Sequence, residues 1–131
     1  MPYTIERTKL FDQWYNGLSE ADQVVVVAMV GLLEKLGTTL PFPYSSGING
    51  SKHKHMRELR KKYKNKLFRI LYAFDPGRVG ILLVGGNKTG DKRWYEKNVP
   101  VADKLYDEHL VDLNKKKKRG YRNEHKTFSR T

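Results

Sequence analysis

An arginine stands alone inside an apolar stretch of the sequence. Arg69 is the only cation in the run from Leu67 to Asp75, which ends in an acid. A charge in an apolar strand is costly unless it reaches a partner. One interpretation is an ion pair of Arg69 with Glu58 or Asp75. The other is a guanidinium held ready for a phosphate, because its planar fork donates two hydrogen bonds to phosphate oxygens.

Glycines and cations follow the next apolar run. Gly85 and Gly86 lie at its end, where the missing side chains let the backbone approach a ligand closely. Three cations and two aromatic residues come next: Lys88, Lys92, Arg93, Trp94 and Tyr95. The spacing is not that of a nucleotide-binding P-loop. Cations beside aromatic rings are typical of surfaces that stack an unpaired base, so we expect Lys92, Arg93 and Trp94 to bind RNA. A core position for Trp94 is the alternative.

Imidazoles and cations are concentrated in residues 51–60: Lys52, His53, Lys54, His55, Arg57 and Arg60. Two histidines two positions apart lie on one side of an extended chain, but no third metal ligand of obvious type stands nearby. We therefore expect no metal site. The pattern favours a phosphate-facing patch in which His53 or His55 carries a proton, because imidazole titrates near neutrality. Ordinary surface positions for these residues are the alternative.

Positive charge is concentrated in the second part of the chain. The 131 residues carry a formal net charge of +12. The first fifty hold three basic and five acidic residues, whereas residues 51–131 hold 23 and nine. This distribution predicts a polyanionic partner, RNA or DNA in the first place. A solvated basic surface with a disordered tail is the alternative.

The composition excludes several classes of protein. Without cysteine the chain has no disulfide, thiolate zinc site, iron–sulfur cluster or cysteine nucleophile. Its 38% of hydrophobic residues suits one domain with a modest core. The longest apolar run, Val24 to Leu33, is far shorter than the ~20 residues of a membrane span, and no signal peptide is visible. We expect a soluble cytoplasmic protein.

The first half of the chain predicts a short strand and two helices. Tyr3 to Ile5 favours a strand, and apolar residues at helical spacing follow from Leu10 to Leu18. Ser19 is a good N-cap for a second helix, which Gly37 ends. The run Val24 to Val27 could instead form a buried strand, but the caps at both ends favour the helix. Prolines and glycines predict an irregular connection over residues 38–50.

The second half predicts three antiparallel strands and a last helix. Strands are expected over residues 56–62, 67–75 and 79–86, joined by short turns. A helix follows to Leu113, with Pro100 in its first turn. The basic residues 114–131 are expected to form a mobile tail. The fold class is α+β: an antiparallel sheet with two N-terminal helices packed on one face and a C-terminal helix, in a single domain of residues 1–113.

Three stretches together resemble a known family. They are Met56 to Arg60, Phe68 to Pro76 and Ile81 to Tyr95, supported by the strings Leu18 to Gln23 and Ala102 to Leu110. They are similar to toxins of bacterial type II toxin–antitoxin pairs, in the RelE/ParE superfamily and its phage-derived, HigB-like branch. The resemblance covers residues 3 to about 113 and implies the RelE-like fold.

The resemblance also implies a function. RelE-like toxins are endoribonucleases that cut messenger RNA, mostly on the ribosome, without a metal or another cofactor. A protein antitoxin, often of helix-turn-helix type, neutralises them. By this similarity Arg69 contacts the scissile phosphate, Lys88 is the basic residue after the following strand, and Tyr95 helps to move the proton.

The sequence departs from RelE at one strand. RelE places lysines there, whereas this chain has Met56, Glu58 and Arg60 along the same alternation. Arg60 remains as a cation, and His53, His55, Lys92 and Arg93 are the candidates to replace the missing lysines. Tyr95 can accept a proton only if surrounding cations lower its pKa.

Two other functions share this fold or this charge. A ParE-like protein would poison DNA gyrase by contact, without RNA chemistry. An inactive nucleic-acid-binding module would also carry the basic charge and the aromatic residues. The joint presence of Arg69, Lys88 and Tyr95 favours the nuclease.

Overall fold

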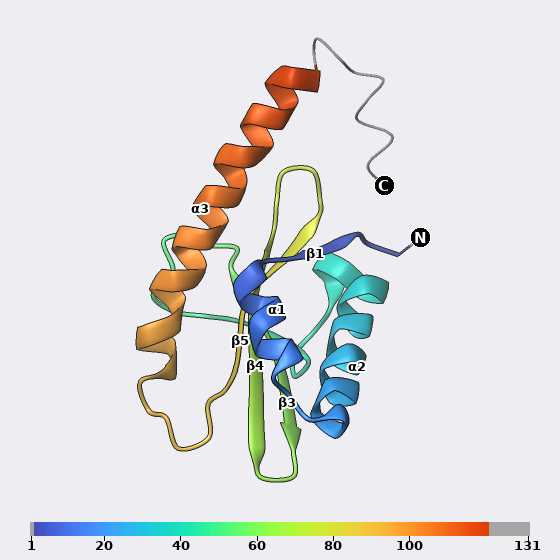
Figure 1. The fold of residues 1–131 in the computed structure, drawn as a ribbon, viewed down its shortest axis with the longest axis vertical. Helices are drawn as coiled ribbons and strands as arrows, with labels where there is room; N and C mark the ends of the chain where they lie inside the picture. Colours follow the sequence, from blue (N-terminus) through green and yellow to red (C-terminus); the bar gives the residue numbers. More distant parts are fainter. Residues whose placement is uncertain (1, 121–131) are drawn as a thin grey trace.

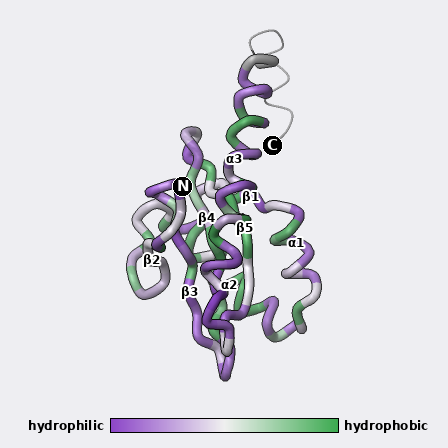
Figure 2. Tube along the Cα trace, turned by 90° about the vertical axis from the view of Figure 1, so that its left-hand side faces the viewer, coloured by the Kyte–Doolittle hydropathy of each residue, from purple (hydrophilic) through white to green (hydrophobic). Residues whose placement is uncertain are grey.

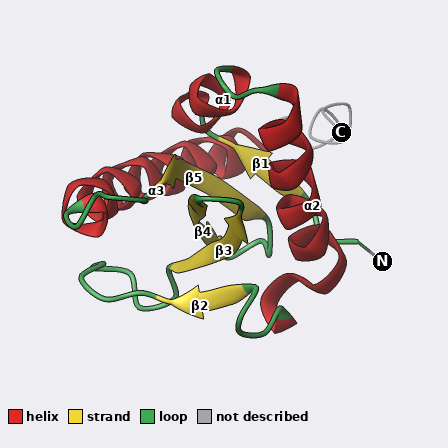
Figure 3. Cartoon of the chain, turned by 90° about the horizontal axis from the view of Figure 1, so that it is seen from below, coloured by secondary structure: helices red, strands yellow, loops and turns green. Residues whose placement is uncertain are grey.

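Five strands form one mixed sheet in the computed structural model, which describes residues 2–120 (Figures 1 and 3). The sheet order is β1-β5-β4-β3-β2. In chain order the elements are β1 (Ile5–Arg7), α1 (Lys9–Asn16), α2 (Glu20–Leu36), a short 3₁₀ helix (Gly37–Thr39), β2 (Ser45–Gly47), β3 (Arg57–Tyr63), β4 (Lys66–Phe74), β5 (Gly80–Asn87) and α3 (Trp94–Gly120). The α+β class and the antiparallel meander of β3, β4 and β5 confirm the expectation from the sequence.

Two N-terminal helices cover one face of the sheet. The hydroxyl of Thr8 accepts a hydrogen bond from the backbone of Phe11 at the start of α1, and Ser19 accepts one from Asp22 at the start of α2. Gly37 ends α2 with a φ of 54°, as its position in the sequence predicted. The side chains between these helices and the sheet form a first core: Phe11, Val26, Met29, Leu33, Leu59, Phe68, Ile70, Tyr72 and Leu82.

The last helix, α3, covers part of the opposite face. Along β4 the residues alternate between the two faces, so Leu71 and Ala73 point toward α3 while Ile70 and Tyr72 point toward α1 and α2. The second core consists of Met56, Leu71, Ala73, Ile81, Leu83, Val84, Trp94, Val99, Ala102 and Tyr106. Figure 2 shows the hydrophobic middle of the sheet between the helices and the hydrophilic tip of the β3–β4 hairpin beyond them.

Two edge features differ from the prediction for the N-terminal part. The connection over residues 38–50 is not wholly irregular, because Ser45–Gly47 pairs with β3 as an edge strand. The buried hydroxyl of Ser45 forms a hydrogen bond with the hydroxyl of Tyr72 (2.6 Å) and accepts one from Nε of Arg57 (2.9 Å). No local sequence pattern predicts these contacts. At the other edge, β1 runs over Ile5–Arg7 and pairs with β5 in parallel.

The prediction for the last helix was wrong at both ends. The helix begins at Trp94, so Pro100 lies inside it. Asp91 precedes the helix in a turn: its carboxylate accepts from the backbone of Arg93 (3.0 Å) and its carbonyl accepts from that of Trp94 (3.3 Å). The helix also continues through residues 114–120, where a mobile tail was expected. Lysine favours helix and stabilises the negative C-terminal end of the helix dipole. The remainder of the expected tail lies outside the described residues.

Candidate active site

Arg69 lies at the centre of the sheet, on the face that α3 partly covers. In the strand register it stands between Arg60 on β3 and Gly86 on β5. Its side chain is buried, with 6% of the residue exposed. Nη1 donates to the carbonyl of Phe68 (2.9 Å) and Nε donates to the hydroxyl of Tyr95 (3.2 Å). The backbone and Tyr95 therefore fix the orientation of the guanidinium.

A buried carboxylate completes the cluster around Arg69. Glu58 is 5% exposed, and its Oε1 accepts a 2.6 Å hydrogen bond from the Tyr95 hydroxyl. The same oxygen lies 3.5 Å from Nε of Arg69, and Oε2 lies 3.6 Å from Nε of Arg60. Glu58 is thus held between two guanidiniums, which compensate its buried charge.

In the sequence analysis, Glu58 is interpreted only as a possible ion-pair partner of Arg69. The structure adds the hydrogen bond to Tyr95, which makes Glu58 part of the candidate site. The alternation of side chains along a strand already placed Glu58 on the face of Arg60. The position of Tyr95 could not be predicted from the sequence, because it depends on how α3 packs against the sheet.

Tyr95 is a protonated phenol at neutral pH. Burial raises its pKa first, and the hydrogen bond to Glu58 raises it further, against the opposing effect of Arg69. The condition under which Tyr95 alone could accept a proton, a pKa lowered by neighbouring cations, is therefore not met. Lys88 Nζ stands 5.8 Å from the centroid of the Tyr95 ring, over its face. A cation over the ring interacts with its π system and leaves the hydroxyl bonded to Glu58 and Arg69.

Because of this environment, we expect Tyr95 to lose its proton at a higher pH than an ordinary tyrosine. Because its folded-state pKa is raised above the ordinary value of 10.0, its contribution to stability is complete below pH 10.0 and is lost as the pH rises through the folded pKa. The phenolate absorbance that is lost in Tyr95→Phe should therefore appear only above pH 10.0 in the native protein. An ultraviolet pH titration of both proteins measures this. A Tyr95 midpoint below that pH would contradict the site geometry.

Trp94 and Gly86 place Tyr95 at the sheet. Trp94 is buried in the second core, so its ring is not exposed for base stacking, and the core alternative applies. A Cβ built on Gly86 would lie 2.5 Å from Nε1 of Trp94. The absence of a side chain at Gly86 is therefore what lets the first turn of α3 dock on β5.

Gly86→Ala is expected to destabilise the protein by about 1–3 kcal/mol, the usual range for overpacking a core. The matched control is Gly31→Ala in α2, where an added Cβ meets nothing within 4 Å. Alanine there should stabilise the helix by about 0.5–1 kcal/mol. Urea unfolding of the two variants measures both changes. Equal stabilities would show that Trp94 moves aside without cost.

The other predicted RNA-binding residues are divided between two surfaces. Lys92 and Arg93 are exposed in the turn before α3, and Arg93 lies 3.7 Å from Glu96. Lys52, His53 and His55 form the second surface, where their side chains contact α3.

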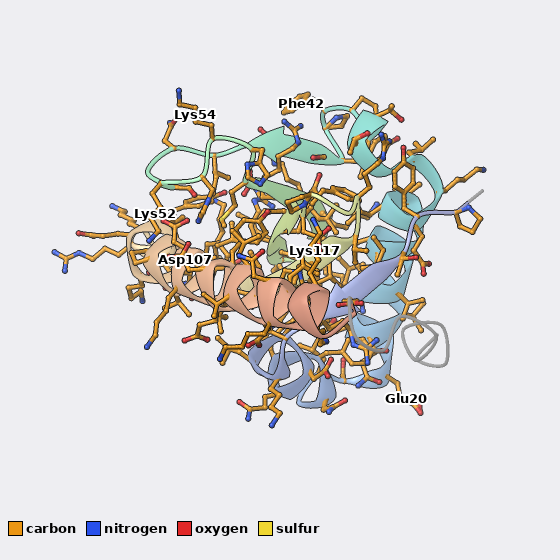
Figure 4. The ribbon with its side chains drawn as sticks, turned by 90° about the horizontal axis from the view of Figure 1, so that it is seen from above. Glu20, Phe42, Lys52, Lys54, Asp107 and Lys117 are labelled. Atoms are coloured by element: carbon orange, nitrogen blue, oxygen red, sulfur yellow. The ribbon has the colours of Figure 1, made fainter. Side chains whose placement is uncertain are left out.

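Contacts with α3 fix three residues of the segment 51–60. Lys52 pairs with Asp107, and His53 Nε2 lies 2.8 Å from the same carboxylate. His55 Nε2 lies 3.1 Å from the hydroxyl of Tyr106. Hydrogen bonds from Lys52 and His53 lower the pKa of Asp107. Lys54 is exposed, and Figure 4 shows it at the margin of the molecule, beyond Lys52 and Asp107.

An open cavity borders the cluster. Its volume is about 420 Å³, and Arg69 and Arg60 line it together with Leu67 and residues 42–44. A ligand in this cavity would therefore contact the guanidiniums of Arg60 and Arg69, on the neighbouring strands β3 and β4. Among residues 2–120, no three histidine, aspartate or glutamate side chains come close enough to hold a metal ion, and no helix is long and apolar enough to cross a membrane.

Comparisons with known proteins give a family and a fold. Residues 13–107 match the family of phage-derived Gp49-like proteins (DUF891). The chain is 39% identical over 102 residues to the toxin candidate HigB2 of Mycobacterium tuberculosis, covering 76% of this chain and 51% of that protein. It is 42% identical over 93 residues to the toxin candidate HigB3 of the same organism, covering 70% of this chain and 80% of that protein. The chain thus spans about half the length of HigB2.

A solved structure shares the fold. In the crystal structure of the RelBE2 toxin–antitoxin complex of M. tuberculosis, one chain superposes with a TM-score of 0.51 at 18% sequence identity. The match covers 66% of this chain and 99% of that one. The fold is therefore RelE-like, in agreement with the resemblance of the three sequence stretches.

Proposed function

We propose a toxin function for this chain, which belongs to the phage-derived Gp49-like family. The proposed activity is metal-independent cleavage of messenger RNA, and the chain would act as the toxin of a type II toxin–antitoxin pair. One observation carries the proposal. Glu58, Tyr95 and Arg69 form a continuous hydrogen-bonded cluster, with Lys88 over the ring of Tyr95, and Arg69 of this cluster lines a basic cavity.

The cluster has the groups that RNA cleavage through the 2′-hydroxyl requires. In this reaction a bond forms between the 2′-oxygen and phosphorus, and the bond from phosphorus to the 5′-oxygen breaks. The products are a cyclic phosphate and a 5′-hydroxyl. A protein must accept one proton, donate another and stabilise the negative charge that develops on the phosphate oxygens.

Glu58 is the proton acceptor in this proposal. Tyr95 donates to Oε1 of Glu58 over 2.6 Å, so its oxygen can take the proton of the 2′-hydroxyl while its own proton passes to the carboxylate. A raised pKa suits this role, because Tyr95 never has to exist as a free phenolate. The sequence left the general base open and allowed Tyr95 this role only with a lowered pKa.

The cations serve the phosphate and the leaving group. Within the protein Arg69 donates from Nε and Nη1, which leaves Nη2 for a phosphate oxygen. Arg69 would stabilise the charge of the pentavalent phosphorus. Lys88 would protonate the departing 5′-oxygen, because its ammonium stands beside the ring of Tyr95. No step needs a metal or another cofactor.

The function is tested in a bacterial cell-free translation reaction. Purified protein is added, and message ends are mapped by primer extension, in parallel with naked RNA. New cuts in translated messages that are absent with Tyr95→Phe would support a ribosome-dependent nuclease. Cuts in naked RNA as well would remove the ribosome from the proposal. Intact messages with normal protein synthesis would overturn the nuclease, and DNA supercoiling by gyrase would be measured next.

An antitoxin is the expected protein partner. The similarity to HigB2 and HigB3 supports this expectation, as does a basic surface that an acidic protein can cover. The neighbouring gene is expected to encode a small helix-turn-helix protein. Co-expression followed by purification through a tag on this chain tests the pair. Failure of the two proteins to copurify would contradict it.

A further inference from the structure

Phe42 is a large aromatic residue held in an exposed position. It lies between the 3₁₀ helix and β2, and 67% of it is exposed. The backbones of Tyr44 and Ser45 both donate to the carbonyl of Pro41 at 3.0 Å, which closes the turn around Phe42. The carbonyl of Tyr44 accepts from the backbone of Arg60, so the turn is tied to β3. Figure 4 shows Phe42 at the outer margin of the molecule. The hydrogen bonds of the turn therefore hold the ring of Phe42 in an exposed position.

The cavity at the candidate active site extends to this ring. Phe42 and Leu67 supply apolar walls, and the charged side chains along the cavity are Arg60, Lys61, Lys62 and Arg69. No acidic residue lines it. Its volume of about 420 Å³ is that of a small-molecule site. A cavity with aromatic walls and only positive charges fits a ligand that has both a flat ring and a negative charge.

Arg60 connects the ring to the floor of the cavity. Its guanidinium carbon lies 5.1 Å from the centroid of Phe42, within the range of a cation–π contact. Its Nε is buried and has no hydrogen-bond partner, because the closest carboxylate oxygen, on Glu58, is 3.6 Å away. Nε therefore faces Glu58, and a phosphate oxygen in the cavity would be bound by the terminal nitrogens of the Arg60 guanidinium.

We propose that Phe42 and Arg60 form a subsite for an unpaired nucleotide next to the scissile phosphate. Its base stacks on the ring of Phe42, and its phosphate accepts hydrogen bonds from Arg60. This inference rests on the proposed function, since it places the scissile phosphate at Arg69. In a duplex both faces of a base are occupied by its neighbours, so the subsite selects single-stranded RNA.

Binding of short RNA oligomers tests the subsite without any cleavage. The full chain carrying Tyr95→Phe is titrated with a fluorescent single-stranded RNA octamer and with an octamer of the same backbone that lacks bases. Adding Phe42→Ala should weaken binding of the RNA about ten- to a hundredfold, the usual effect of losing one stacked base. Binding of the abasic oligomer should not change. Phe42→Trp should restore the affinity for the RNA.

The control variant is Val27→Ala, at another exposed apolar residue, on α2. It should bind both oligomers as the parent protein does. Unchanged RNA affinity of Phe42→Ala would overturn the subsite, as would an equal loss for the abasic oligomer. Loss of antitoxin binding in Phe42→Ala with unchanged RNA affinity would assign the ring to the protein partner and also overturn it. These readouts do not use cleavage, so an inactive chain that still binds RNA through Phe42 would refute the nuclease and leave the subsite standing.

Discussion

Glu58→Gln is expected to lower RNA cleavage about a hundred- to ten-thousandfold, the usual contribution of a general base. Glutamine keeps the size of the side chain and can still accept the hydrogen bond from Tyr95, which measures 2.6 Å in the native protein. It cannot accept a proton at neutral pH. Cleavage in the translation reaction measures the loss, and RNA binding should remain within a few-fold of the native affinity.

The control for this variant is Glu96→Gln, which changes an exposed carboxylate on the same helix as Tyr95. Its cleavage rate should equal that of the native protein. Native activity in Glu58→Gln would contradict the role of Glu58 and return the proton transfer to another group. A loss of folding in Glu58→Gln, seen by circular dichroism, would instead show that the carboxylate serves mainly as a counterion for Arg69.

Arg69→Met is expected to affect both stability and activity. Removing one partner of a buried ion pair costs about 3–5 kcal/mol, because the buried Glu58 then keeps only one of its two guanidinium partners, Arg60. Cleavage should fall about a hundred- to a thousandfold, the usual loss when a donor to a developing anion is removed. Urea unfolding measures the first effect. Cleavage at a temperature at which the variant is folded measures the second.

The double variant Glu58→Gln/Arg69→Met separates the two effects. With no carboxylate left to compensate, it should regain part of the stability and none of the activity. Arg7→Ala is the matched control, because Arg7 pairs with Asp12 in an exposed ion pair. That change should cost no more than about 1 kcal/mol. A double variant as unstable as the sum of both single variants would contradict the coupling of Glu58 and Arg69.

The sequence predicted correctly those helices and strands whose ends are marked by capping or turn residues. Ser19 and Gly37 mark both ends of α2, and the turns between the central strands contain glycine, proline or asparagine. Strand alternation then predicts the face on which Glu58, Arg60 and Arg69 meet. One of the two interpretations of Arg69 named Glu58 as its partner, and the structure places Nε of Arg69 3.5 Å from Oε1 of Glu58.

Features that depend on distant contacts were not predictable in the same way. β2 pairs with β3, and its Ser45 bonds to the side chains of Tyr72 and Arg57, which come later in the chain. The start of α3 was misplaced because Pro100 was assigned to the first turn of the helix, whereas the helix begins at Trp94. The protonated state of Tyr95 follows from its burial against Glu58, which depends on how α3 docks. Residues 38–50 were set aside as irregular, although Phe42 lies among them.

The pairing of β1 with β5 determines the order in which this chain can fold. β1 leaves the ribosome first, but its partner residues, Gly80 to Leu82, are synthesised much later. The hydroxyl of Thr8, which caps α1, also donates to the carbonyl of Leu83. The contacts of the β3–β4–β5 meander are local in sequence, whereas the pairing of β1 and the bond from Thr8 to Leu83 must wait for β5. Tyr95 follows later still, so a nascent chain completes the hydrogen-bonded cluster of Glu58, Tyr95 and Arg69 only after β3, β4 and β5 have been made.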